Sequence, residues 1–166
     1  MNPVMDRKSF TVPEASALIP VMEDVFEGIR ERRARLEELD ERLQLLDVLW
    51  GERLYQPMNP DFPEFARCRT AVRRTVREVE GLIQNEILGR GVRFPPGGLD
   101  QGLLDFPTTL DGRWVFLCWR SGEAELRSWH EVDGGFAGRR PLTRAVAQRM
   151  GRTAHNEDLE DLSAAS

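Results

Sequence analysis

The chain has 166 residues, of which 40% are hydrophobic and 31% are charged, and its net charge at pH 7 is −5. This length suits one domain, or one domain with an appendage, and so high a share of charge is typical of long exposed helices. The acidic balance argues against a general polyanion-binding protein, which carries a basic excess, so nucleic acid is not expected as a partner.

The N-terminal segment and the cysteines predict a cytoplasmic protein. Residues 1–10 are polar and charged, unlike the apolar centre of a secretion signal. The longest apolar run, Trp114 to Trp119, is too short to cross a bilayer, so no membrane partner is expected. Without export, Cys68 and Cys118 should stay reduced.

The first long helix is predicted from a start signal and a regular apolar spacing. Thr11-Val12-Pro13-Glu14 has the composition of a capping box, and Pro20 predicts a kink or a restart after a short helix over 12–19. The long helix should then run from 20 to 50. Its apolar residues recur at alternating steps of three and four, interrupted by Arg32, as in helices that pack side by side. They are Met22, Val25, Ile29, Leu36, Leu39, Leu43, Leu46 and Trp50.

A second helix is predicted after the turn-forming segment 56–60. Asp61-Phe62-Pro63-Glu64 repeats the capping-box pattern, and Gly89 and Gly91 suit a helix end. The apolar spacing continues, with Arg69 as its interruption, at Phe62, Phe65, Val72, Val76, Val79 and Ile83. Folding about residue 56 gives an antiparallel, coiled-coil-like hairpin in which Asp40 lies near Arg73. The arginine-rich runs are therefore interpreted as ion-pairing surfaces rather than nucleic-acid surfaces.

Past Gly91 the pattern changes to the alternation of β-strands. Strands are expected over 92–94, 103–109, 113–120 and 124–131. Pro107 favours an edge position, and Asp111-Gly112 is a preferred two-residue hairpin turn. The predicted fold class is α+β: a long antiparallel helical hairpin over 1–91, then a three- to four-stranded antiparallel β-meander over 92–142 packed on the hairpin base. A flexible acidic tail over 143–166 follows, with one or two helical turns over 143–150.

Several short motifs follow one another along the chain in a recognisable order. They are Gly102 to Pro107, Leu117 to Glu123, Trp129-His130-Glu131 and Gly135 to Arg139, preceded by the opening segment from Phe10 to Pro20. Over residues 10–142 the chain resembles the family catalogued as domain of unknown function 2203. This resemblance implies a bacterial protein with helices first and a sheet second. It implies no particular activity or cofactor.

Polar residues of the β-unit are the candidates for a ligand site: Asp105, Arg120, Glu123, His130, Glu131, Arg139 and Arg140. A histidine beside a carboxylate can act as a general base or a metal ligand, but adjacent strand residues point to opposite faces, which favours a structural role for His130. The loop from Gly134 to Arg140 offers backbone donors and two guanidinium groups that suit a carboxylate or a phosphate. In the competing interpretation these arginines bind carboxylates of the same chain.

Cys118 and His130 would form a nucleophile and a base only if they shared a face of the sheet. A turn of two or four residues after Arg120 puts them on opposite faces, whereas a three-residue turn with a bulge puts them on the same face. Even turns are common, so no catalytic residue is predicted. The acidic residues of the β-unit match no calcium loop or zinc-site spacing, so no metal ligands are predicted either.

Two functions of different classes remain open. The amphipathic hairpin favours an interaction or scaffold module that forms a homodimer or binds a protein partner. The alternative is a small anion- or metal-binding protein, with or without enzymatic activity, whose site lies near His130, Glu131 and Arg139.

Overall fold

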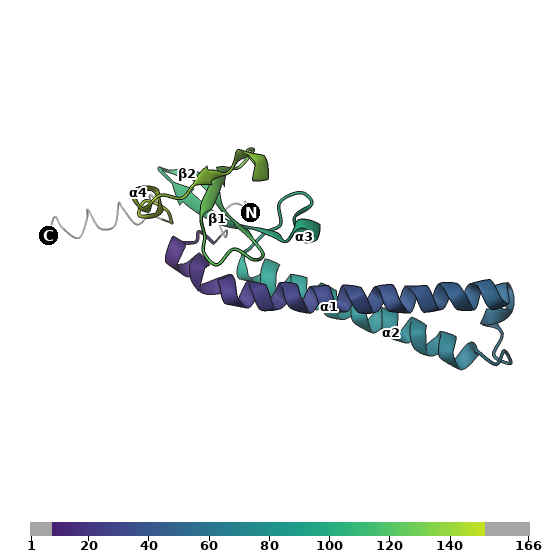
Figure 1. Cartoon of the computed structure of the whole chain (residues 1–166). Coiled ribbons are helices and arrows are strands. Elements are labelled where there is room, and N and C mark those ends of the chain that lie inside the picture. Colours follow the sequence, from purple (N-terminus) through teal and green to yellow (C-terminus); the bar gives the residue numbers. More distant parts are fainter. Residues whose placement is uncertain (1–7, 152–166) are drawn as a thin grey trace, which may run out of the picture. The chain divides into compact units, whose positions relative to one another are not determined.

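The computed structural model of the chain describes residues 8–151 and has the predicted α+β order of helices before a sheet (Figure 1). The chain forms two compact units. One consists of residues 25–86, and the other consists of the described residues on either side of them. Within residues 8–151, no helix is both long and apolar enough to cross a membrane.

Helix α1 spans Val12–Trp50 without a break. Its start is the predicted one: the Thr11 hydroxyl accepts the backbone N–H of Glu14 at 3.2 Å and donates to the Glu14 carboxylate at 3.0 Å. The predicted restart at Pro20 is wrong. Proline removes a single backbone donor, and the helical turns on both sides of it hold the helix together. A 3₁₀ turn over Gly51–Tyr55 follows α1.

Helix α2 spans Phe62–Gly81 and continues through a π-helical segment over Leu82–Ile87 and a 3₁₀ turn over Leu88–Arg90. It ends at Gly91, whose φ of 85° lies in the left-handed region that glycine tolerates, as predicted. The predicted capping box at its start is wrong. The Asp61 carboxylate instead accepts the indole N–H of Trp50 at 2.7 Å, and the Glu64 carboxylate binds Arg42.

The two helices form the predicted antiparallel hairpin (Figure 1). Ion pairs join them: Arg32 Nε lies 3.0 Å from Glu78 Oε2, and Arg42 Nη2 lies 2.8 Å from Glu64 Oε2. Asp40, the expected neighbour of Arg73, does not pair with it. The Asp40 carboxylate instead accepts a hydrogen bond from Gln44 of the same helix. Complementary charge therefore lines the hairpin, as predicted, but between other residues.

The buried face of α2 is rotated from the predicted one. Cys68 and Thr75 are buried, whereas Arg69 and Val76, which the apolar spacing placed in the seam, are exposed. This rotation leaves the Arg69 guanidinium in water, where its charge costs least. The Thr75 hydroxyl is satisfied within the helix, because it donates to the Ala71 carbonyl at 2.8 Å.

The sheet has four antiparallel strands in the order β1-β2-β3-β4. They are β1 (Leu103–Leu110), β2 (Arg113–Arg120), β3 (Ser128–Glu131) and β4 (Arg140–Pro141). A short helix, α3 (Gly98–Gln101), precedes β1. The hairpin turn at Asp111 and Gly112 is confirmed, and both residues have positive φ, at 51° and 79°. Strand β3 is shorter than predicted, and β4 lies in a segment that was predicted to be a loop.

Strand β1 is an edge strand, as Pro107 predicted, but other segments cover its outer edge. The expected strand over 92–94 is reduced to one such contact, a bridge at Arg93. The backbone bonds along this edge are Phe10 N–H to the Pro107 carbonyl (2.8 Å), Arg93 with Asp105 in both directions (2.9 and 2.8 Å) and Gly151 N–H to the Thr109 carbonyl (3.1 Å). An edge paired in this way offers fewer free backbone groups to another chain.

One face of the sheet forms the core of its unit. Leu104, Phe106, Leu117 and Trp119 are buried there, and the Phe10 ring packs edge-on against Phe106 with centroids 5.4 Å apart. The other face carries the polar residues described below.

The predicted helical turns after the sheet are confirmed as α4 (Arg144–Ala147), where the Thr143 hydroxyl accepts the Val146 N–H. Of the predicted acidic tail over 143–166, the part from residue 152 onward lies outside the described residues.

Candidate functional site

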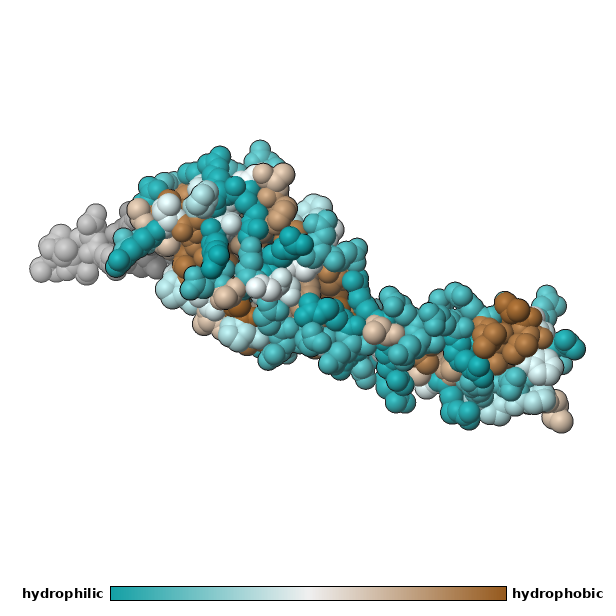
Figure 2. Space-filling view, in the orientation of Figure 1, coloured by the Kyte–Doolittle hydropathy of each residue, from teal (hydrophilic) through white to brown (hydrophobic). Residues whose placement is uncertain are grey.

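The closed end of the hairpin exposes large apolar side chains. Leu45, Val48 and Leu49 share one face of α1, because residues three and four apart on a helix are neighbours, and Tyr55 and Met58 lie in the connection that follows. Val48 is 82% exposed and Met58 is 92% exposed. Figure 2 shows the resulting hydrophobic area over the end of α1. We call Leu45, Val48 and Leu49 the apolar ridge.

The apolar ridge is not needed to hold the hairpin together. The inner side of the same end has its own core of Leu46, Leu54 and Phe65, with further apolar side chains packed around it. The bond from Trp50 to Asp61 ties the end of α1 to the start of α2. The hairpin end therefore has packing and hydrogen-bond contacts in which the ridge takes no part.

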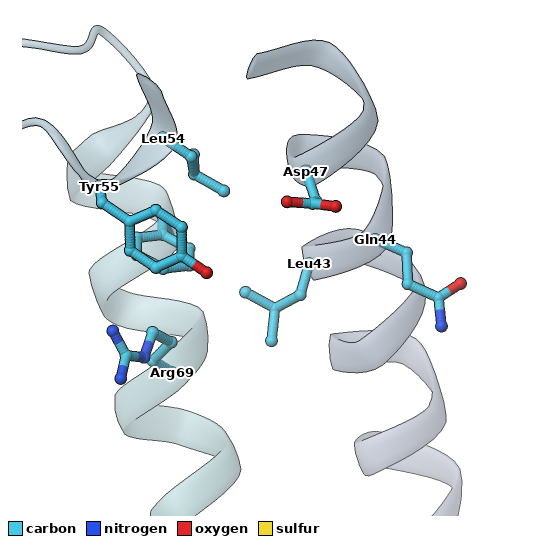
Figure 3. A pocket seen from close by; sticks show the side chains of 7 residues that line it. Leu43, Gln44, Asp47, Leu54, Tyr55 and Arg69 are labelled. Atoms are coloured by element: carbon cyan, nitrogen blue, oxygen red, sulfur yellow. The ribbon is translucent and has the colours of Figure 1, made fainter. Parts of the chain in front are cut away.

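A groove of about 410 Å³ lies between the helices beside the ridge (Figure 3). Its lining mixes apolar and polar groups: Leu43, Gln44, Asp47, Leu54, Tyr55, Phe65 and Arg69. The Tyr55 ring packs edge-on against Phe65 at 5.2 Å, and the Arg69 guanidinium lies 5.3 Å from the centre of the Phe65 ring. The groove thus has one wall already ordered by ring contacts.

Carboxylates surround the apolar ridge. Glu41 precedes it by one helical turn, Asp47 lies within it in sequence and Glu52 follows it, and all three are exposed. None of the three has an ion-pair partner among residues 8–151. Two nearby arginines are already engaged, since Arg42 binds Glu64 and Arg53 stacks over Trp50. The surface is therefore apolar in the middle and acidic at its rim.

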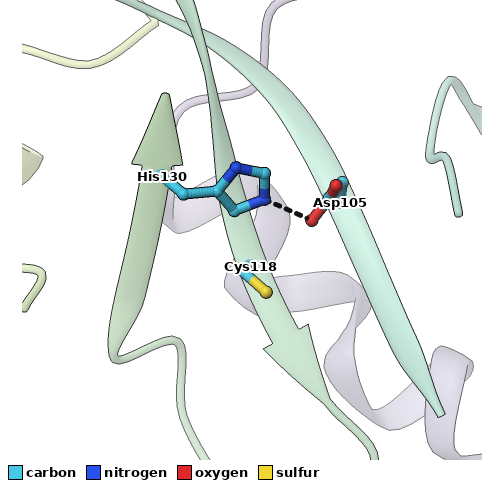
Figure 4. A group of neighbouring side chains, drawn as sticks. All are labelled: Asp105, Cys118 and His130. Atoms are coloured by element: carbon cyan, nitrogen blue, oxygen red, sulfur yellow. Dashed lines mark hydrogen bonds and ion pairs between the residues drawn. The ribbon is translucent and has the colours of Figure 1, made fainter. Parts of the chain in front are cut away.

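A second group of side chains lies on the sheet face that is opposite to the core. Asp105 of β1 is directly opposite Cys118 of β2, and His130 of β3 is opposite Phe116, two residues from Cys118. Side chains two apart on a strand share a face, so Asp105, Cys118 and His130 point the same way (Figure 4). The expectation that Cys118 and His130 lie on opposite faces is wrong, because an odd number of residues, 121–127, connects β2 to β3.

The hydrogen bonds of His130 define its protonation. Nδ1 lies 2.7 Å from the Glu131 carbonyl oxygen, which can only accept, so Nδ1 carries a proton. Nε2 lies 3.0 Å from Asp105 Oδ1, and it must also carry a proton if Asp105 is ionised. Burial disfavours the imidazolium, but the bonds to Asp105, Cys118 and Glu131 outweigh this and raise the pKa of His130 to about 10. Asp105 and His130 then form a buried ion pair.

This geometry does not favour Cys118 as a nucleophile. Both ring nitrogens of His130 already have oxygen partners, so neither is held in place as a base for the thiol. Cys118 is also fully buried, which keeps a substrate away from its sulfur. What the three residues do offer is one carboxylate oxygen, one sulfur and one ring nitrogen, all within 4.8 Å of one another.

Glu131, the neighbour of His130, lies on the opposite face of the sheet. Its carboxylate accepts from Arg113 at 2.8 Å, which lowers the pKa of Glu131, and Arg140 lies 3.6 Å away. The Arg140 guanidinium also stacks over Trp129. Glu131 therefore contributes its carbonyl, rather than its carboxylate, to the group around His130.

Glu123 and Arg139 form a third group. Arg139 Nη2 lies 2.9 and 3.0 Å from the two Glu123 oxygens, and the backbone N–H of Arg120 donates to the same carboxylate at 3.0 Å. Arg139 also approaches the Cys118 carbonyl at 3.5 Å. The seven residues predicted as a ligand site therefore do not form one site: Asp105 lies with His130, Glu131 with Arg140, and Glu123 with Arg139 and the backbone of Arg120. Both arginines of the glycine-rich loop bind carboxylates of the same chain.

Comparison with known proteins agrees with the resemblance seen in the sequence. A family described as "Uncharacterized conserved protein (DUF2203)" matches residues 8–142, which is most of the chain. No curated protein and no solved structure matches this chain.

Proposed function

We propose that this chain, which belongs to the DUF2203 family, is an interaction module whose hairpin end binds a helix of another protein. The observation that carries this proposal is the apolar ridge, whose central residue Val48 is 82% exposed. Contiguous apolar side chains on the surface of a protein mark places where another molecule binds. The spacing of the ridge is the one with which helices pack into each other.

The negative charge around the apolar ridge indicates which kind of partner helix would bind there. Glu41, Asp47 and Glu52 leave the rim negative, so the complementary partner is an amphipathic helix with an apolar stripe flanked by lysine or arginine. Two copies of this chain meeting through the ridge would bring carboxylates against carboxylates, which disfavours a homodimer. The α1 wall of the groove beside the ridge offers Leu43 and Asp47 to the same helix, whereas Arg69 lies on the α2 wall (Figure 3).

A peptide assay tests this proposal. The probe is a synthetic amphipathic helix with leucines at helical spacing and lysines at its flanks, and its affinity is measured by fluorescence anisotropy. We expect the double variant Val48→Ser and Leu49→Ser to weaken binding by about tenfold or more, because two exposed apolar side chains lose their buried area in the complex. The same peptide with glutamate flanks should bind more weakly than the lysine version.

The matched control is Val132→Ser, since Val132 is 60% exposed but lies in the other unit. It should leave peptide binding unchanged. Exposed substitutions of this kind change stability little, so circular dichroism should show all variants folded. Equal binding by the ridge variant and the wild type would refute the proposal. So would a dimer in analytical ultracentrifugation that the ridge variant dissociates, because the ridge would then bind a second copy.

A further inference from the structure

The geometry points to a zinc site formed by Asp105 Oδ1, Cys118 Sγ and His130 Nε2 in the sheet. This site is separate from the hairpin surface and does not depend on it. The three side chains come from three neighbouring strands, and the backbone register holds them on one face. Their ligand atoms all lie within 4.8 Å of one another, and Nε2 and Oδ1 are 3.0 Å apart. Bonds to zinc of about 2.0–2.3 Å bring ligand atoms to comparable separations.

The second ring nitrogen of His130 is held as it is in metal sites. A metal-binding histidine usually donates its other N–H to a carbonyl or a carboxylate, which fixes the ring and turns the free lone pair to the metal. Here Nδ1–H donates to the Glu131 carbonyl at 2.7 Å, so Nε2 is the nitrogen that faces Asp105 and Cys118. The hydrogen bond that would orient His130 as a metal ligand is therefore already present.

A divalent ion at this position keeps the group neutral, as the Asp105–His130 pair does without metal. The three residues are between 0% and 4% exposed, so net charge there is costly. The Asp105 carboxylate and a Cys118 thiolate carry two negative charges, and neutral His130 adds none, so one Zn²⁺ makes the group neutral. When Zn²⁺ binds, the proton on Cys118 Sγ and any proton on His130 Nε2 pass to solvent, and no electron is transferred.

The type of ligand selects the metal. A thiolate and an imidazole suit zinc and other borderline-soft ions, whereas calcium and magnesium require oxygen ligands. Three protein ligands leave a fourth position for water or for a ligand, as in catalytic rather than structural zinc sites. The site is buried, so we expect the ion to enter most readily while the chain folds.

The test uses the full chain, freed of metal with a chelator and loaded with Zn²⁺ or Co²⁺ both as the native protein and during refolding from urea. Competition with a colorimetric chelator measures Zn²⁺ affinity, and the absorption of Co²⁺ reports thiolate ligation and tetrahedral geometry. We expect one ion per chain and a sulfur-to-cobalt charge-transfer band. Cys118→Ser should abolish the band and weaken Zn²⁺ binding at least tenfold.

The matched control is Cys68→Ser, because Cys68 is the other buried free cysteine and lies in α2. It should keep the band and the affinity. If Cys118→Ser fails to fold, histidine ring ¹⁵N spectra of the wild type decide: Zn²⁺ should shift Nε2 of His130 and leave its Nδ1–H intact. A folded wild type that binds no ion under either loading condition would overturn the proposal. A cobalt band that survives in Cys118→Ser, or an unshifted His130 ring, would also overturn it.

Discussion

The buried pair of Asp105 and His130 allows a sharp prediction about stability in the metal-free protein. Asp105 is 4% exposed and its carboxylate takes its side-chain hydrogen bond from His130 Nε2 at 3.0 Å. Replacing His130 by leucine keeps most of the volume but leaves a buried carboxylate without this partner. Breaking a buried ion pair in this way costs about 3–5 kcal/mol. We expect His130→Leu to lose that amount of unfolding free energy.

Two further variants distinguish an unpaired charge from simple loss of packing. In Asp105→Asn, the amide N–H can donate to Nε2 of a neutral histidine while Nδ1–H stays on the Glu131 carbonyl, so the cost should be only about 1 kcal/mol. The double variant Asp105→Leu and His130→Leu buries no charge at all. Apolar replacement of a buried pair is often nearly neutral, so this double variant should be more stable than His130→Leu alone.

Urea denaturation at pH 7 with a chelator measures all three variants. Glu27→Gln is the control, because the ion pair of Glu27 with Arg30 is exposed and its loss should change stability by less than about 0.5 kcal/mol. If the double variant proves less stable than His130→Leu, the reasoning fails, since packing rather than an uncompensated charge would then dominate. A cost below about 1 kcal/mol for His130→Leu would refute it as well.

Two other predictions concern pH and one close contact. The pKa of His130 is raised from 6.5 to about 10 in the folded state, so its stabilising contribution is complete below pH 6.5 and is lost as the pH rises to 10. Metal-free wild type should therefore lose on the order of a few kcal/mol over this range in urea denaturation, and the double leucine variant should lose much less. Gly98→Ala should cost about 1–3 kcal/mol, because an added Cβ would lie 2.6 Å from Pro95 Cδ and 3.0 Å from the Leu103 carbonyl oxygen. Thermal denaturation measures this loss. Gly138→Ala is the control, because its added Cβ would meet nothing within 4 Å, and it should show little change. An equal loss in both variants would show that the close contact at Gly98 is not the cause.

Features with local causes could be predicted from the sequence. Thr11 and Glu14 fix the start of α1 through bonds within one turn, and Gly91 ends the second helix through its own φ angle. The Asp111-Gly112 turn sets the register of β1 and β2. That register already places Asp105 opposite Cys118, so two of the three clustered residues could have been placed together from the sequence.

Features that depend on distant parts of the chain could not be predicted in the same way. The position of His130 follows from where β3 begins, and residues 121–127 give no local signal for that point. Strand β4 has two residues and exists because β3 is beside it. The rotation of α2 keeps Arg69 exposed. The free-energy cost of burying its charge in the seam depends on the facing helix, which the apolar spacing within α2 does not reveal.

The paired outer edge of β1 has a consequence for biosynthesis. Its backbone partners come from Phe10 and Arg93, which are made before the strand, and from Gly151, which is made long after it. A nascent chain can therefore complete the helices and most of the sheet while one flank of β1 still lacks its last neighbour. Unpaired strand flanks can recruit other chains, so the stretch of β1 around Thr109 is open to such contacts between the synthesis of residues 110 and 151.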